Sequence, residues 1–466
     1  MRTTPAHDTT TRIPTPTPGH ARAPAPFADG TLSLLRKGYG WLPDLRRRAA
    51  EAEAVPVRVL GRRGVALHGR RAVEFFYDER NLRRTDALPG PVLDTLFGRG
   101  AVHTLDGEPH RERKALFMVL LTDPDRIGAL VERVGEEWER AEAEWPGREP
   151  VVLFDETARI LTRAVYGWAG VPLPPDAVAD NARDLVAMVD GFATPGPRRT
   201  RARRARQRQE RRLAALIEEL RSAGAPSGQA TLAQAMAAYC DAGSGQPDPR
   251  TVAVELLNVL RPVVAVAWFL TFAAHALHRW PQHRAPLAGE THGGIADATA
   301  DATAEDPDHN MDDYARAFAQ EIRRFYPFVP FLGGLAARDT QWQDTPLREG
   351  DLVLLDVYGL HHDPVWWPEP YAFDPDRFAP GGSARPDVLI PQGGGDPATG
   401  HRCPGEDITL ALLTALLPRL ARLRHTLPAQ DLSIPLRRMP TRPRDGYVMT
   451  GMHRRVALSE QHHRGG

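Results

Sequence analysis

The stretch GGGDPATGHRCPGE, residues Gly393–Glu406, contains the residue on which the fold assignment depends. Cys403 is one of only 2 cysteines in the chain. Pro404 directly after it suits the first turn of a helix, where a missing N–H leaves no bond unmade. The apolar run Ile408–Leu413 predicts that this helix is buried. We therefore expect Cys403 at or near a helix N-cap, where free N–H groups and the helix dipole stabilise a thiolate and lower its pKa.

Several roles remain open for such a cysteine. A thiolate after a glycine-rich loop is what an axial haem ligand requires. Cys403 could equally be a buried structural thiol, a disulfide partner of Cys240, or a reactive nucleophile. No Cys-x-x-Cys pair supports zinc, and Gly393–Gly395 does not link a strand to a helix as a phosphate-binding loop would. The rest of the chain has to decide.

The lack of repeats and linkers makes a single large α-rich domain a serious option. The 466 residues would suggest about three domains by length alone, but residues 30–456 show no internal repeat and no convincing linker. A hydrophobic content of 42% is ample for a core. With 59 basic and 59 acidic residues, no bulk charge favours nucleic acid or an anionic membrane as a partner. Two cysteines in this length fit a reducing, cytoplasmic location.

Low-complexity segments lie at both ends and in one internal stretch. Residues 1–26 are rich in Thr, Pro and Ala, and they predict a disordered tail that is neither a signal peptide nor a membrane anchor. Residues 457–466 predict a second disordered tail. Residues 285–310 predict a flexible surface insertion within the main domain, which we expect to span residues 27–456.

The basic run Arg198–Arg212 is the one local charge anomaly. We interpret it as a solvated helix face. The alternative is a positive rim that attracts anionic substrates.

Helical periodicity dominates the chain, so the predicted fold class is mostly α with a small β part. The predicted helices are 125–144, 153–169, 203–223, 249–279, 311–325 and 407–424. The predicted strands are short: 55–60, 64–68, 331–337 and 351–355.

The longest apolar helix, residues 249–279, contains an arginine in its middle. Charged residues interrupt this helix, so it is expected to cross a protein core and not a membrane. Arg261 is followed by Pro262, which removes a backbone hydrogen bond and is expected to kink the helix. A buried arginine needs an anion. An internal carboxylate such as Glu255 could be that anion, although a separation of six residues does not put the two on one helical face. The alternative is the carboxylate of a ligand.

A second charge cluster is expected further along the chain. Glu321 and Arg324 lie at i and i+3 on a helix and can pair, and Arg377 of the segment FDPDRF could complete a buried cluster. His361 and His362 are residue types that bind metals, but adjacent residues of a strand point to opposite faces and do not easily share one metal ion.

Taken together, these motifs resemble the cytochrome P-450 haem-thiolate family over most of residues 30–456. The matching order is a long central helix, Glu321-x-x-Arg324, Asp363-Pro364, Pro375–Phe378 and Cys403-Pro404-Gly405. The resemblance implies a single large domain of the cytochrome P-450 fold that encloses haem b. It further implies that Cys403 is the axial thiolate and iron ligand, and that a structural triad lies behind the haem: Glu321, Arg324 and Arg377.

Two departures narrow the resemblance. Where the usual haem loop has Phe and Gly, this chain has Asp396 and Thr399. The central helix also lacks the usual acid–threonine pair and reads NVLRPV around Arg261. Together with the loop QGGG…GHRCPGE, this is similar to the fatty-acid peroxygenase branch. Further similarity lies in RFYPF, residues 324–328, and FLGG, residues 331–334.

The resemblance to this branch implies a function that agrees with the chemistry of the residues. Hydrogen peroxide brings oxygen that is already reduced, so no reductase is obligatory. A fatty-acid carboxylate held by Arg261 would act as the acid–base for O–O cleavage and would place Cα and Cβ for reaction. Pro262 would let the guanidinium face the iron. Implied products are α- or β-hydroxy acids, or terminal alkenes formed by oxidative decarboxylation.

The segment Phe97–Gly107 resembles the distal segment of the same branch. Phe97 would flank the bound chain, and His103 would lie above the haem as a proton donor, with a satisfied core or surface histidine as the alternative. Four further residues would contact the haem propionates: Arg84, His110, Lys114 and His401. The alternative is that these four are ordinary side chains that face solvent.

The leading hypothesis is therefore peroxide-dependent oxidation of long-chain fatty acids. A reductase-dependent cytochrome P-450 monooxygenase is the first alternative, against which the missing acid–threonine pair and Arg261 count. A haem-thiolate sensor is the second, but neither tail is long enough to fold as a signalling domain.

Overall fold

The computed structural model describes residues 28–192, 194–224, 228–241, 245–289 and 307–452. The predicted tails 1–26 and 457–466, and residues 290–306 of the predicted insertion, lie outside these ranges.

The helices are α1 (Thr31–Lys37), α2 (Trp41–Arg48), α3 (Arg70–Tyr77), α4 (Gly90–Val92), α5 (Gly107–Leu121), α6 (Pro124–Glu144), α7 (Leu153–Ala169), α8 (Val178–Gly191), α9 (Pro197–Ala223), α10 (Leu232–Ala238), α11 (Pro249–Arg279), α12 (Arg284–Ala288), α13 (Pro307–Phe325), α14 (Val357–His361) and α15 (Glu406–Arg422). The strands are β1 (Ala54–Val59), β2 (Arg62–Leu67), β3 (Leu82–Arg83), β4 (Val151–Val152), β5 (Phe331–Ala336), β6 (Thr340–Trp342), β7 (Thr345–Leu347), β8 (Leu352–Asp356) and β9 (Val448–Met449).

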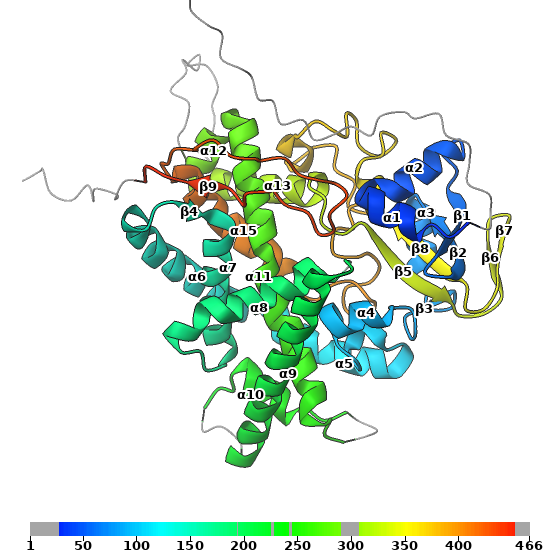
Figure 1. Cartoon of the computed structure of the whole chain (residues 1–466), viewed down its shortest axis with the longest axis horizontal. Helices are drawn as coiled ribbons and strands as arrows, with labels where there is room; N and C mark the ends of the chain where they lie inside the picture. Colours follow the sequence, from blue (N-terminus) through cyan, green and yellow to red (C-terminus); the bar gives the residue numbers. More distant parts are fainter. Residues whose placement is uncertain (1–27, 193, 225–227, 242–244, 290–306, 453–466) are drawn as a thin grey trace, which may run out of the picture.

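The main sheet lies at one side of the molecule and the large helices lie at the other (Figure 1). Its strand order is β1-β2-β8-β5-β3, in which β2 and β8 run parallel and the other neighbours run antiparallel. Its central strand β8 is buried at every position. The hairpin of β6 and β7 extends from the connection between β5 and β8. The sheet thus carries the chain from the helical half to the loops before α15.

Helix α11 is the centre of the helical half. Helices α7, α8, α9 and α15 pack around it (Figure 1). Asp248 caps its N-terminus by accepting hydrogen bonds from the backbone N–H groups of Arg250 and Thr251, at 2.9 and 3.1 Å. The helix is long and apolar enough to cross a membrane, but 94% of its most apolar window is buried inside the protein. Its composition is therefore that of a core helix, as the sequence predicts.

The fold class is confirmed, and the long helices agree closely with prediction. Helices α7 and α11 have the predicted bounds, whereas α9 begins at Pro197, six residues before the predicted start. The helix α8 was not predicted. Part of the predicted insertion is ordered, because Arg284–Ala288 forms the helix α12, which packs on α15.

Two local expectations were wrong. His361 and His362 lie at the end of helix α14 and not in a strand, and each has backbone partners. His361 Nε2 accepts from the N–H of Ile390 at 3.0 Å, and His362 lies within hydrogen-bond distance of the Phe325 and Tyr358 carbonyls. Helix α15 begins at Glu406, so Pro404 precedes its N-cap, Gly405, and does not open its first turn.

Candidate active site

Cys403 lies two residues before the N-cap of α15, in a loop held by one glutamine. Its backbone N–H donates to the carbonyl of Gln392 at 3.0 Å, and the Gln392 side-chain amide lies 3.6 Å from Sγ. Burial raises the pKa of the thiol, although the N–H of Gly405 and the Gln392 amide act in the opposite direction. The lowered pKa expected from the helix end alone was therefore wrong, since burial outweighs these donors.

A disulfide is excluded as the role of Cys403. Cys240 is exposed, and both cysteines are free. Cys403 itself is enclosed by protein and still keeps part of its surface accessible.

Arg323 braces the cysteine loop, and this residue was missed by sequence reasoning. Its guanidinium donates to Gln392 Oε1 at 3.0 Å and to the carboxylate of Glu406. Arg402 Nε donates to the same carboxylate at 2.7 Å. Lys114 of α5 donates to the backbone carbonyl of Arg402. Lys114, which the sequence predicted to contact a haem propionate, thus has a backbone partner next to Cys403.

The predicted triad comes together in the core. Arg324 donates to Glu321 from Nε at 2.7 Å and from Nη2 at 2.6 Å. Arg377 Nε lies 3.8 Å from the same carboxylate. The remaining Arg324 donors reach the backbone carbonyls of His361 and Pro370. This cluster ties α13 to the segment that leads toward the cysteine loop.

Arg261 is a buried cation for which the described residues provide no carboxylate. Its side chain is 6% exposed, its Nη2 lies 3.4 Å from Asn258 Oδ1, and its Nε has no hydrogen-bond partner. Burial and the nearby Arg206 lower the pKa of Arg261 to about 9, while a thiolate at Cys403 acts in the opposite direction. A thiolate at Cys403 and the guanidinium of Arg261 would therefore interact electrostatically. Helix α11 continues through Pro262 without interruption.

Phe97 and His103 lie against Arg261. Their rings are 4.4 Å apart between centroids, and the Arg261 guanidinium carbon lies 5.8 Å from the centre of the Phe97 ring. Burial and the charge of Arg261 hold the pKa of His103 well below its ordinary value, so the imidazole is neutral at pH 7. Its Nδ1 has no partner. The distal segment thus brings an aromatic wall and a neutral imidazole to the cation.

The residues predicted to contact propionates form a second group. The rings of His110 and His401 stack with centroids 3.9 Å apart. Burial lowers the pKa of His110 to about 3. Arg84 donates from Nη2 to the carbonyl of Phe76 at 3.1 Å, but its Nη1 has no partner. His401 Nε2 lies 3.7 Å from Asp106, beyond hydrogen-bond distance.

The pattern of unsatisfied atoms fits an anionic haem. Buried nitrogens without a hydrogen-bond partner recur at Arg84, His103, His110, Arg261 and His401. Buried polar atoms are normally satisfied, so such a group of potential donors indicates a ligand with acceptors. Haem propionates would supply acceptors for the three of these residues predicted to contact them, Arg84, His110 and His401. The thiol of Cys403 supplies the ligand atom that haem iron takes in haem-thiolate proteins.

Arg206 is another functional candidate that sequence reasoning missed. It was grouped with a solvated basic run, but it is only 2% exposed. It donates to the carbonyl of Leu96 at 2.6 Å and to that of Phe97 at 2.9 Å, while its Nε donates to Glu210 at 2.6 Å. The alanines at positions 202 and 205 were the available signal, because small residues at this spacing mark a packed helix face.

A cavity of about 450 Å³ lies beside Arg206. Its lining includes Gly98, Arg99, Arg203, Arg206 and Val254. Arg206 therefore lies between this cavity and the backbone of Phe97.

Comparison with known proteins agrees with this geometry. The family model described as Cytochrome P-450 matches residues 179–440. A variant of cytochrome P-450SP alpha (CYP152B1) superposes with a TM-score of 0.83 and 40% identity, covering 91% of this chain and 99% of that chain. Wild-type cytochrome P-450EX alpha (CYP152N1) with myristic acid gives 0.81 and 33%, covering 91% and 97%. A variant of the OleT cytochrome P-450 in complex with arachidonic acid gives 0.82 and 32%, covering 91% and 96%.

Curated relatives are more distant or match over shorter segments. Cytochrome P-450 4A11 of Homo sapiens is 31% identical over 183 residues, 39% of this chain and 33% of that protein. The chain aligns with about one third of the length of the first such relatives. Cyclooctat-9-en-7-ol 5-monooxygenase of Streptomyces melanosporofaciens is 24% identical over 434 residues, 88% of this chain and 90% of that protein.

The thiol, the triad and the nearly full-length superpositions lead to one assignment. The resemblance drawn from the sequence motifs, including that to the fatty-acid peroxygenase branch, is confirmed. The chain belongs to the cytochrome P-450 family of haem-thiolate enzymes, alongside the CYP152 structures it matches.

Proposed function

We propose that the protein oxidises long-chain fatty acids with hydrogen peroxide. The products are α- or β-hydroxy acids, terminal alkenes formed by oxidative decarboxylation, or both. The observation that carries this proposal is Arg261, a buried cation without a carboxylate partner among the described residues. Two of the matched structures contain myristic acid and arachidonic acid, which agrees with a carboxylate as the missing anion.

Arg261 binds and orients the substrate carboxylate. A guanidinium offers a planar pair of donors that matches a carboxylate, and the apolar surroundings strengthen the pair. The bound carboxylate then accepts a proton from peroxide and returns it to the departing oxygen. Cys403 would hold the haem iron, which would supply the chemistry of O–O cleavage and oxygen transfer. Because the carboxylate is fixed, Cα and Cβ are the carbons nearest the reacting centre.

Phe97 and His103 complete the site. Phe97 packs beside Arg261 and keeps water from the ion pair, which strengthens it. The neutral imidazole of His103 donates one N–H and accepts at the other nitrogen, so it can hold a proton near the substrate without adding charge. Pro262 leaves the helical hydrogen-bond pattern incomplete beside Arg261.

No reductase is obligatory in this scheme, because peroxide supplies oxygen that is already reduced. We also infer a cytoplasmic location, in keeping with the two free cysteines. The second candidate function is a reductase-dependent monooxygenase, which the match to a curated monooxygenase favours.

The decisive experiment uses purified holoprotein, myristic acid and hydrogen peroxide without a reductase. We expect hydroxy acid or alkene. Arg261→Ala should lose this activity and retain its haem, whereas Arg80→Ala, which removes an exposed arginine, should behave as wild type. Short carboxylic acids should restore oxidation of substrates that lack a carboxylate. No product with peroxide, together with turnover when a reductase and NADPH are added, would support the monooxygenase instead.

A further inference from the structure

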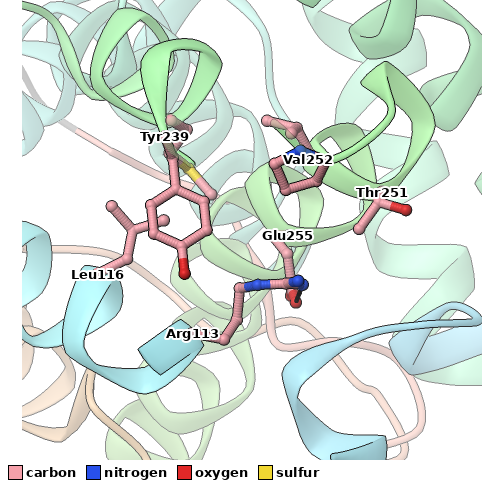
Figure 2. Close-up of a pocket in the computed structure, with 8 residues that line it drawn as sticks. Arg113, Leu116, Tyr239, Thr251, Val252 and Glu255 are labelled. Atoms are coloured by element: carbon pink, nitrogen blue, oxygen red, sulfur yellow. Dashed lines mark hydrogen bonds and ion pairs between the residues drawn. The ribbon is translucent and has the colours of Figure 1, made fainter. Parts of the chain in front are cut away.

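Glu255 is a buried carboxylate whose contacts account for both of its oxygen atoms. It lies on α11 and is 2% exposed. Its Oε1 accepts from the backbone N–H of Val102 at 2.7 Å and from Arg113 Nη1 at 3.0 Å. Its Oε2 accepts from the side-chain amide of Asn258 at 3.3 Å. Figure 2 shows the Arg113 guanidinium directed at this carboxylate.

These partners connect Glu255 to both sides of the candidate active site. Val102 directly precedes His103 in the distal segment. Asn258 donates from Nδ2 to the carbonyl of Phe97 at 2.9 Å, and its Oδ1 faces Arg261 Nη2 at 3.4 Å. One carboxylate thus holds the backbone next to His103 and, through one amide, both Phe97 and Arg261.

We propose that Glu255 is a positioning residue that sets the distance between Arg261 and the Phe97–His103 pair, and thereby selects which carbon of the fatty acid reacts. This inference rests on the proposed function, because it assumes that Arg261 holds the substrate carboxylate. The fatty acid is anchored by its carboxylate to Arg261 on α11. A shift of the distal segment relative to α11 therefore moves the Phe97 ring and the His103 imidazole relative to the fatty-acid chain. Since Cα and Cβ are adjacent carbons, small displacements change the products.

The chemistry of the contacts requires a carboxylate at this position. All three partners are N–H donors, and an ionised carboxylate only accepts. A glutamine would offer one acceptor oxygen and would direct an NH₂ group at another donor. Arg113 neutralises the charge and is itself held by Asp241 at 3.0 Å. A buried pair of this kind holds its geometry because breaking it leaves an uncompensated charge.

Little space for solvent lies beside Glu255. The cavity beside Glu255 is only about 10 Å³, and its lining includes Arg113, Leu116, Tyr239 and Val252 (Figure 2). That volume is about one water-sized probe, so the space between these side chains holds about one water molecule. A change at Glu255 would act on the distal segment through its contact with Val102.

The test compares Glu255→Gln with a matched control, Glu156→Gln. Glu156 of α7 is 5% exposed and pairs with Arg148 at 2.9 Å, so its loss should disturb folding in a similar way without touching the distal segment. Each holoenzyme receives myristic acid and hydrogen peroxide, and the α-hydroxy, β-hydroxy and alkene products are quantified. For Glu255→Gln we expect the ratio of products to change by about threefold or more and kcat to fall more than KM rises. Glu156→Gln should keep the wild-type ratio.

Unchanged product ratios and an unchanged kcat in Glu255→Gln would overturn the inference. If that variant fails to take up haem, Asn258→Ser tests the same link, since it breaks the amide bridge and leaves the pair of Glu255 and Arg113 intact. A wild-type ratio in Asn258→Ser would then overturn it.

An inactive wild type with peroxide would contradict the proposed function, whereas the positioning of Arg261 and the distal segment by Glu255 could still be tested through fatty-acid binding. In that case the readout becomes the absorbance shift that myristic acid induces in the haem. Equal shifts in Glu255→Gln and wild type would overturn the inference, and a smaller shift in the variant would support it.

Discussion

Arg324 binds the carboxylate of Glu321 with two hydrogen bonds, and neither side chain has any exposed surface. Burial raises the pKa of Glu321, while the bidentate contact with Arg324 acts in the opposite direction. The same guanidinium also donates to three backbone carbonyls, those of His361, Pro370 and Ala372. One side chain thus determines the path of the chain after α14, which later leads to Cys403.

Arg324→Ala should therefore strongly destabilise the fold. The change leaves a buried carboxylate unpaired and removes donors from three backbone carbonyls, for which we expect a loss of about 3–5 kcal/mol in the free energy of unfolding. Urea titration of the holoprotein and the yield of haem-loaded protein measure this. Arg377→Ala should lose less, because Arg377 Nε is 3.8 Å from the same carboxylate. Equal losses in the two variants would contradict this account.

Arg206→Met should destabilise the protein and weaken fatty-acid binding together. The variant leaves Glu210 without this partner and removes the donors to the Leu96 and Phe97 carbonyls, with a loss of about 3 kcal/mol expected in unfolding free energy. Binding is measured by the change in haem absorbance on titration with myristic acid. Arg204→Met, two residues earlier and exposed, is the control and should change stability by about 0.5 kcal/mol or less.

His68 should stabilise the fold at neutral and acidic pH and lose this effect in base. Burial lowers the pKa of His68, but the carboxylates of Asp356 and Asp363 outweigh burial and raise it above the ordinary 6.5. Because its pKa is higher in the folded state than in the unfolded state, His68 contributes its full stabilisation of the fold below about pH 6.5. This contribution to the free energy of unfolding is lost as the pH rises through the folded-state pKa. Unfolding free energies of wild type and His68→Gln, compared across this range, should converge in base. A constant difference would contradict the prediction.

His275 should make the fold less stable as the pH falls, whereas His68 makes it less stable as the pH rises. Burial lowers the pKa of His275 to about 3, and its Nδ1 lies 2.8 Å from the Tyr326 hydroxyl. Between about pH 6.5 and about pH 3 the unfolded chain takes up a proton that the folded chain refuses, so stability falls as pH falls, by about 1.4 kcal/mol per pH unit. His275→Gln removes this titration and should show a shallower acid limb in a series of urea titrations. Parallel limbs for variant and wild type would refute the assignment.

Local patterns predicted the helices and the motif residues well, because these signals lie within a few turns of chain. The period of apolar residues gave the bounds of α7 and α11, and the spacing of Glu321 and Arg324 predicted their pairing. The predicted range 407–424 starts within one residue of α15, but placing Pro404 in the first turn was wrong because Gly405 is the N-cap.

Long-range partners were the part that could not be predicted. Glu255 meets Arg113 across a separation of 142 residues, and Arg206 meets Leu96 across 110. Each glutamate or arginine has many complementary charges in this chain, and only the packing of α11 against its neighbours selects among them. The thiol of Cys403 shows the same limit, since its burial and not its helix position determines the direction of its pKa shift.

Pro262 removes one backbone hydrogen bond from the middle of α11. A proline has no N–H, so the carbonyl of Asn258, four residues earlier, lacks its regular helical donor. The Asn258 carbonyl oxygen, about one turn before Arg261, is thereby left without the single N–H donor that an ordinary helix supplies. Amide-I infrared spectroscopy with ¹³C at the Asn258 carbonyl should therefore resolve a weakly bonded band, and its frequency would report on any hydroxyl group that approaches the guanidinium.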